Sequence, residues 1–164
     1  MLFKNYAPIN TTCFTGHREL ADDAVEAIDA LLETAITELC DRGVTTFLAG
    51  GAQGFDTLAA LKVLDMKARF PQIRLKLILP CRNQTEQWDA EDVGIYQYIL
   101  SRADDHRFLF ESYVEGCMQE RDRCLVEEAD ACVAFCERSQ SGTSLTLAAA
   151  VNAGIDTVNL CDYL

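Results

Sequence analysis

The feature that most constrains the fold of this chain is an alternation of short apolar segments with longer amphipathic ones from one end to the other. The short segments are rich in Val, Ile, Thr and Phe, which favour strands. We expect strands at 10–15, 45–49, 73–79, 107–110, 131–136 and 156–160, with helices between them. Strands that alternate with helices form parallel sheets, because right-handed crossovers place the helices on the two faces. The sequence therefore predicts an α/β fold, a single domain over residues 1–164 with a doubly wound, mainly parallel sheet and helices on both faces.

Charges within the third predicted strand suggest an order for the sheet. Arg74 and Lys76 alternate there with apolar residues, and one polar face is typical of an edge strand. We therefore predict the order 3-2-1-4-5, in which the third strand is an edge. The order then reverses between strands one and four, and ligands of such sheets bind at the carboxyl ends of the strands beside that point.

The composition restricts the ligand and the compartment. A formal net charge of −12 repels phosphate backbones, which makes extended nucleic acid a poor partner. The eight cysteines include no CxxC pair, so neither a metal site nor a redox dithiol is expected, and they are interpreted as small buried hydrophobes of a reducing compartment. No apolar run approaches about 18 residues, and the first ten residues lack the apolar core of a signal peptide. We expect a cytoplasmic protein without a membrane segment.

A glycine-rich loop follows the second predicted strand and leads directly into a helix. It contains Gly50, Gly51 and Gly54, where backbone amides at a helix start can approach an anion without interference from Cβ atoms. The alternative is that these glycines only permit a tight turn and close helix packing. The loop is not a Walker A motif, since no GK[ST] follows, and no GxGxxG follows the first strand. A conventional NAD pose is therefore not expected.

Other predicted loops at the same end of the sheet add hydroxyl groups and positive charge. Ser141, Gly142 and Thr143 begin a second helix, where they offer backbone donors or, alternatively, a plain N-cap. Arg18 and Arg121 supply guanidinium groups that suit a phosphate, although each alone is also consistent with a surface ion pair. Taken together, these loops predict a phosphate-bearing small molecule as the ligand.

Five segments of the chain carry a resemblance to a known family. They are FTGHR (14–18), AGGAQGFDTLAA (49–60), ILPCRNQTEQW (78–88), YVEGCMQERDRCLVEEADACVAF (113–135) and SGT (141–143). In this order they resemble the YpsA-like branch of the SLOG superfamily, a bacterial-type family, over nearly the whole chain. The resemblance implies a Rossmann-like fold that binds nucleotides or nucleotide-derived ligands such as ADP-ribose-like compounds, with no obligatory cofactor. Homodimerisation is suggested by related SLOG proteins alone.

The resemblance also implies roles for individual residues. The loop after the first strand contributes Gly16, His17 and Arg18. The glycine-rich segment is similar to the nucleotide- and DNA-contacting segment of DprA, which adds Asp56 to the three glycines already named. The segment around Arg121 resembles the stretch of LOG-type phosphoribohydrolases that carries their catalytic arginine. The glutamate of their closing motif falls on Thr146, and LOG-type chemistry is therefore not expected.

Three functions remain open on the sequence. We favour a binding or sensor protein for a nucleotide-like ligand and assign no catalytic residue. The first alternative is a hydrolase acting on an N-glycosidic or phosphate bond of a nucleotide, with Asp56, Glu120 or His17 in place of the missing acid. The second is a single-stranded DNA binder like DprA, for which only Trp88 and scattered tyrosines offer stacking platforms.

Overall fold

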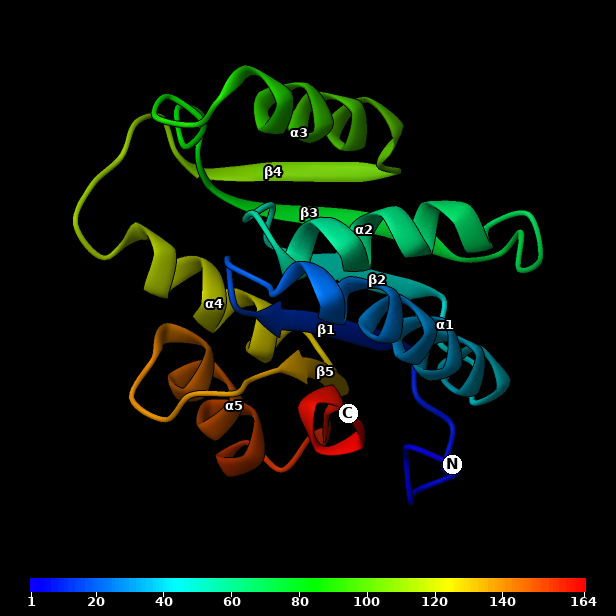
Figure 1. Ribbon diagram of the computed structural model, residues 1–164. Helices are drawn as coiled ribbons and strands as arrows, with labels where there is room; N and C mark the ends of the chain where they lie inside the picture. Colours follow the sequence, from blue (N-terminus) through cyan, green and yellow to red (C-terminus); the bar gives the residue numbers. More distant parts are fainter.

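The computed structural model describes residues 1–164 and contains one six-stranded sheet with helices on both faces (Figure 1). Every pair of neighbouring strands is parallel. The strands are β1 (Thr11–Gly16), β2 (Thr46–Ala49), β3 (Arg74–Cys81), β4 (Asp105–Phe110), β5 (Ala131–Phe135) and β6 (Asp156–Asn159). The helices are α1 (Val25–Asp41), α2 (Phe55–Met66), α3 (Ala90–Arg102), α4 (Cys117–Glu127) and α5 (Gly142–Asn152), with 3-10 turns η1 (Asp22–Ala24) and η2 (Leu160–Tyr163). The predicted doubly wound α/β fold is confirmed.

The predicted strand order is wrong. The observed order is β4-β3-β2-β1-β5-β6, so that β3 lies inside the sheet, β4 is an edge, and β5 is the second neighbour of β1. The charges of β3 have another cause: the Lys76 ammonium lies 3.8 Å from a carboxylate oxygen of Glu128, at the end of α4, and Glu128 also pairs with Arg107 of β4. The charge of Lys76 therefore reflects an ion pair to the end of α4 and not an exposed edge, whereas Arg74 lies exposed at the first position of the strand and forms no ion pair.

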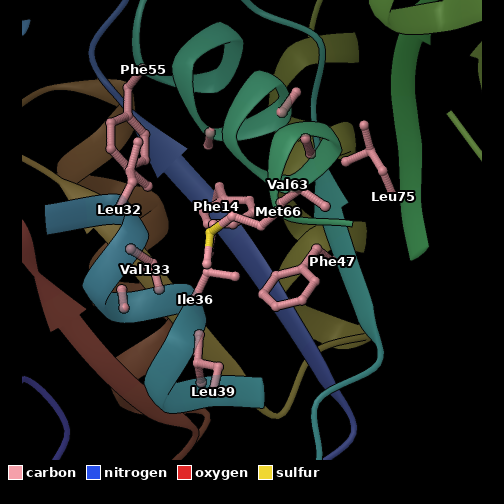
Figure 2. Packing of buried hydrophobic residues seen from close by; sticks show 14 of the residues in the cluster. Phe14, Leu32, Ile36, Leu39, Phe47, Phe55, Val63, Met66, Leu75 and Val133 are labelled. Atoms are coloured by element: carbon pink, nitrogen blue, oxygen red, sulfur yellow. The ribbon is translucent and has the colours of Figure 1, made fainter. Parts of the chain in front are cut away.

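The core consists of two layers, one on each face of the sheet. The larger layer packs α1, α2 and α3 against the strands, and Figure 2 shows Leu32 and Ile36 of α1 facing Phe14 and Phe47. The smaller layer lies under α4 and α5 and contains Cys13, Leu48, Ile78, Leu125, Val126, Ala129, Cys132, Ala134 and Ala150. The neighbours Cys13 and Phe14 enter different layers, because successive residues of a strand point to opposite faces.

Helix α4 decides where the site forms. It follows the edge strand β4, yet it packs against β3, β1 and α5 and so crosses the sheet before β5 begins (Figure 1). The helices that follow β1 and β5 lie on opposite faces, which makes the carboxyl ends of these two strands the point where the order reverses. The residues of α4 therefore reach this point even though β4 is three strands away from β1.

Candidate functional site

A cavity of ≈ 750 Å³ opens at the carboxyl ends of β1 and β5. Its walls come from the loop after β1, the start of α2, one side of α4 and the start of α5. Its volume falls in the range of about 300–1,000 Å³ that small-molecule sites occupy. Most of the residues that the sequence selects line it, namely Gly16, His17, Arg18, Asp56, Arg121, Ser141, Gly142 and Thr143.

The three glycines after β2 lie behind the cavity wall and not on it. A Cβ atom on Gly50 would lie 2.7 Å from Cδ of Arg121, and one on Gly54, whose φ is +73°, would lie 2.3 Å from the carbonyl oxygen of Arg18. The amide of Phe55, at the start of α2, donates to the carbonyl oxygen of His17 at 3.1 Å. Gly50 and Gly54 therefore bring the loop close to residues that line the cavity, while the Phe55 amide is already engaged within the protein.

Arg121 is held rigidly at the inner wall of the cavity. Arg121 is only 4% exposed. Its Nη1 donates to the carbonyl oxygen of Gly50 at 2.5 Å, and its Nε donates to Oδ1 of Asp122 at 2.6 Å. The remaining nitrogen, Nη2, has only a weak contact of 3.9 Å with the sulfur of Met118. Arg121 thus forms a partly buried ion pair with Asp122, and its Nη2 keeps unused donor capacity.

Two further arginines on the walls carry no ion pair. Arg18 and Arg138 line the cavity and take part in no salt bridge, whereas the wall residues Asp122 and Glu127 are each paired with an arginine of α4. Arg138 is absent from the sequence-based site, although it lies in the loop between β5 and Ser141. Unpaired guanidinium groups in a chain of net charge −12 favour an anionic ligand at this point.

The start of α5 presents free donors to the cavity. Ser141 is a true N-cap: its Oγ accepts from the amide of Ser144 at 3.1 Å, and Ser144 Oγ accepts from the amide of Ser141 at 2.8 Å. The amides of Gly142 and Thr143 have no partner in the protein, and neither does the hydroxyl of Thr143, a residue that is 8% exposed. These donors, together with the helix dipole, suit an anion.

His17 holds the loop after β5 in place. Its Nε2 accepts from the amide of Glu137 at 2.8 Å and from the amide of Arg138 at 3.4 Å, so the proton of the neutral ring is on Nδ1. Burial lowers the pKa of the imidazole, and the nearby charge of Arg138 lowers it further. His17 therefore positions Arg138 and α5 as a neutral acceptor, which leaves Nε2 without the capacity to act as a base.

Asp56 is the carboxyl group with the most unusual environment in the cavity. It is 6% exposed, and its Oδ2 accepts from the amide of Ala52 at 3.2 Å. Burial raises its pKa from 3.8 to about 6, although the charge of Arg121 acts in the opposite direction. A carboxyl group that titrates near neutral pH can both donate and accept a proton, as general acid–base chemistry requires.

The other residues considered for catalysis are less suited to it. Glu120 does not line the cavity, and its carboxylate pairs with Arg123 of the same helix. Thr146 does line the cavity, but its hydroxyl donates to the carbonyl oxygen of Gly142 at 3.0 Å, and a hydroxyl cannot replace a titrating carboxyl group near neutral pH.

Metal-binding and membrane-spanning features are not found in the structure. No group of three or more His, Cys, Asp or Glu residues is arranged to hold a metal ion. None of the helices combines the length and the apolar character that a bilayer span requires. All eight cysteines are free thiols, and four of them, Cys13, Cys81, Cys117 and Cys132, are buried.

Several bacterial proteins are similar to this chain in sequence. A UPF0398 protein of Bacillus velezensis is 25% identical over 124 residues, which cover 74% of this chain and 68% of that protein. UPF0398 proteins of Brevibacillus brevis and Staphylococcus saprophyticus are also 25% identical, over 118 and 144 residues that cover 71% and 82% of this chain and 63% and 77% of theirs. The chain thus spans about two thirds of the length of the Bacillus and Brevibacillus relatives.

Two solved structures share the fold. DNA processing protein A (DprA) of Streptococcus pneumoniae superposes with a TM-score of 0.67 at 17% sequence identity, covering 92% of this chain and 49% of that one. DprA of Helicobacter pylori, which is described as having a unique single-stranded DNA binding mode, gives a TM-score of 0.65 at 17% identity and covers 92% and 64%. At this identity the likeness concerns the fold.

A family model matches the chain from β1 to β6. The model is that of YpsA, described as the YspA SLOG family, and it covers residues 12–158. This range includes all the elements that form the cavity walls. The chain therefore belongs to the YpsA family of SLOG proteins.

Proposed function

We propose that this protein binds a phosphate-bearing, nucleotide-like small molecule in the cavity between β1 and β5, as a binding or sensor protein. The observation that carries the proposal is the convergence of Arg18, Arg121 and Arg138 with the open start of α5 in one cavity. An ADP-ribose-like compound combines the phosphate and ribose groups that such a wall recognises.

The donors of the site fall into two sets with different tasks. The amides of Gly142 and Thr143 and the hydroxyl of Thr143 suit phosphate oxygens, because they are fixed by the capped helix and need no reorganisation. The guanidinium groups of Arg18 and Arg121 add charge beside them. Asp56 supplies an oxygen that accepts from a ribose hydroxyl when it is ionised.

A small ligand is favoured over a nucleic acid strand by the charges around the cavity. The chain carries −12 overall, and the cavity itself is also lined by Glu19, Asp56, Asp122 and Glu127. A strand that neutralises several phosphates needs an extended basic surface. DprA of H. pylori shares this fold and is described as binding single-stranded DNA, and a nucleotide is the unit that such a strand and a small nucleotide ligand have in common. Tight DNA binding is therefore one of the outcomes that the binding experiments distinguish.

A hydrolase is the second candidate, and Asp56 is the observation that favours it. Its raised pKa and its place on the cavity wall beside Arg121 are what proton transfer to a leaving group requires. Under this alternative, the parent protein would hydrolyse nucleoside monophosphates to a free base or inorganic phosphate, whereas the Asp56→Asn variant would not. A chromatographic assay distinguishes the two candidates, since a sensor leaves these compounds unchanged.

Calorimetry with ADP-ribose, AMP and ribose 5-phosphate tests the proposal. At 100 times its dissociation constant a ligand adds ~2.7 kcal/mol to stability, which for a chain of this size raises the melting temperature by roughly 5–10 °C. Arg18→Ala should weaken binding by about ten-fold or more, since hydrogen bonds to charged groups contribute about 1.5–3 kcal/mol.

Arg102→Ala is the matched control for Arg18→Ala. Arg102 lies on α3, packs over the ring of Tyr98 and, like Arg18, takes part in no salt bridge. Its replacement by alanine therefore makes the same change in net charge at a position away from the cavity. Its affinity should stay within about two-fold of the parent's. Equal affinities of the two variants would reject the cavity as the site. Tight, length-dependent binding of an oligonucleotide at physiological salt would instead support a DNA-binding function.

A further inference from the structure

A second, smaller hollow of ≈ 390 Å³ lies directly beside the main cavity. The two share Arg18 and Glu19, so the loop after β1 is a common wall between them. The other walls of the hollow are the starts of α1, α2 and α3, on the face of the sheet opposite α4 and α5. A molecule that lies across Arg18 would therefore contact both spaces.

The walls of this hollow differ in chemistry from those of the main cavity. The apolar part consists of Leu20, Val25, Leu58, Trp88 and Ile95. The indole of Trp88 packs edge-to-face against the ring of Tyr96, with a centroid distance of 5.6 Å and an interplanar angle of 79°, which fixes its orientation. Apolar walls with a fixed aromatic side chain suit a flat ring better than a sugar or a phosphate.

The polar part of the hollow consists mainly of acceptors. Asp92 Oδ2 accepts from Nε2 of Gln53 at 2.9 Å, an interaction that fixes both side chains. Oδ1 of Asp92 and the amide oxygen of Gln53 make no hydrogen bond within the protein, so both remain able to accept. A carboxylate disfavours a second anion but binds the N–H groups of an exocyclic amine well.

We propose that this hollow is a subsite for an amino-bearing nucleobase, with the phosphate of the same ligand placed across Arg18 in the main cavity. The inference rests on the proposed function, because it uses the phosphate site to orient the molecule. It narrows the ligand class to nucleotides whose base carries an exocyclic amino group, such as adenine, and places the base between Trp88 and Asp92. The base would then lie on one face of the sheet and the phosphate at the start of α5 on the other.

The protein contains one tryptophan, so fluorescence excited at a wavelength that its five tyrosines do not absorb reports on the surroundings of Trp88. AMP should change the Trp88 emission on binding, because the base contacts the indole. Ribose 5-phosphate should bind in calorimetry without changing that emission, and more weakly than AMP by about ten-fold or more. Saturating ribose 5-phosphate should raise the AMP concentration needed for the fluorescence change, since the two compete for one phosphate site.

A pair of variants separates the base contact from general charge effects. Asp92→Asn should weaken the binding of AMP about ten-fold, because it removes the charge of an acceptor in the hollow. The affinity for ribose 5-phosphate should stay unchanged, because this compound has no base. Glu91→Gln makes the same charge change in the same first turn of α3 but does not line the hollow, and it should leave both affinities unchanged. Circular dichroism of each variant checks that α3 is intact.

The outcomes distinguish this inference from the proposed function. If ribose 5-phosphate and AMP bind with equal affinity and neither changes the Trp88 emission, the base subsite is wrong while the phosphate site stands. An equal loss of affinity for AMP and for ribose 5-phosphate in Asp92→Asn would likewise contradict the proposed base subsite. If neither compound binds the parent protein at millimolar concentration, both proposals fall together.

Discussion

Replacing Asp56 by Asn should stabilise the free protein at neutral pH. Asp56 is buried at the cavity wall, and burial raises its pKa from 3.8 to about 6. One pKa unit corresponds to about 1.36 kcal/mol, so ionisation of Asp56 in the folded protein costs about 3 kcal/mol relative to the unfolded chain. Asparagine retains an oxygen that can accept from the amide of Ala52 and carries no charge.

The gain should depend on pH in a defined direction. Because the folded-state pKa lies above the unfolded one, the folded protein binds more protons between pH 3.8 and about 6, and the parent loses stability as pH rises through this window. The unfolding free energy of Asp56→Asn should therefore exceed the parent's by an amount that grows from pH 4 upward and levels off near about 3 kcal/mol at pH 7. That difference corresponds to roughly 6–12 °C in melting temperature.

Urea unfolding of both proteins from pH 4 to pH 8 measures this difference. Asp65→Asn is the control, because Asp65 lies exposed on the same helix and its replacement should change the unfolding free energy by no more than about 0.5 kcal/mol at any pH. A difference between parent and Asp56→Asn that does not vary with pH would refute the reasoning. So would a variant that is less stable than the parent at pH 7.

Three further predictions concern the loops and the N-terminal segment. Burial lowers the pKa of His17 from 6.5, so its acceptor role is complete at pH 6.5 and above and is lost only as the pH falls through the lowered pKa. Hydrogen-exchange protection of the Glu137 amide should therefore decrease only at pH values below 6.5. Gly54→Ala should destabilise the protein by more than about 1 kcal/mol, because a Cβ atom there meets the backbone of Arg18 at a positive φ. Gly94→Ala, at an open position within α3, should stabilise the protein by roughly 0.5–1 kcal/mol, and thermal unfolding of both variants measures the contrast. Glu38→Ala should cost about 1–3 kcal/mol and hasten proteolysis before β1, because two N-terminal amides lose their acceptor; an unchanged cleavage rate would contradict this.

The local features of this protein follow from the order of its residues. The alternation of apolar segments predicts each strand and helix, because side-chain periodicity and stop signals such as Gly43, with φ +95°, act over a few residues. The start of α5 is likewise readable from Ser141, Gly142 and Thr143, since capping depends on neighbouring residues alone. Eight of the eleven ligand-binding residues selected from the sequence line the cavity.

Long-range placement was decided by the tertiary structure. The prediction that β3 is an edge is wrong, because the sequence does not reveal that α4 crosses the sheet and brings its C-cap residue Glu128 to Lys76. Arg121 reaches the cavity by that same crossing, and not because β4 adjoins β1. Parallel strands joined by helices leave no local signal of which strands pair, so their order emerges only from packing of the whole sheet.

The sequence by itself determined the class of fold, the family and the set of loops that gather at one end of the sheet. Only the tertiary structure placed Arg138 on the cavity wall, raised the pKa of Asp56 and built the hollow around Trp88. The physical reason is that periodicity and capping arise between near neighbours in the chain. Burial, electrostatic coupling and concave walls require several elements to come together, and their magnitudes depend on distances that residue order does not contain.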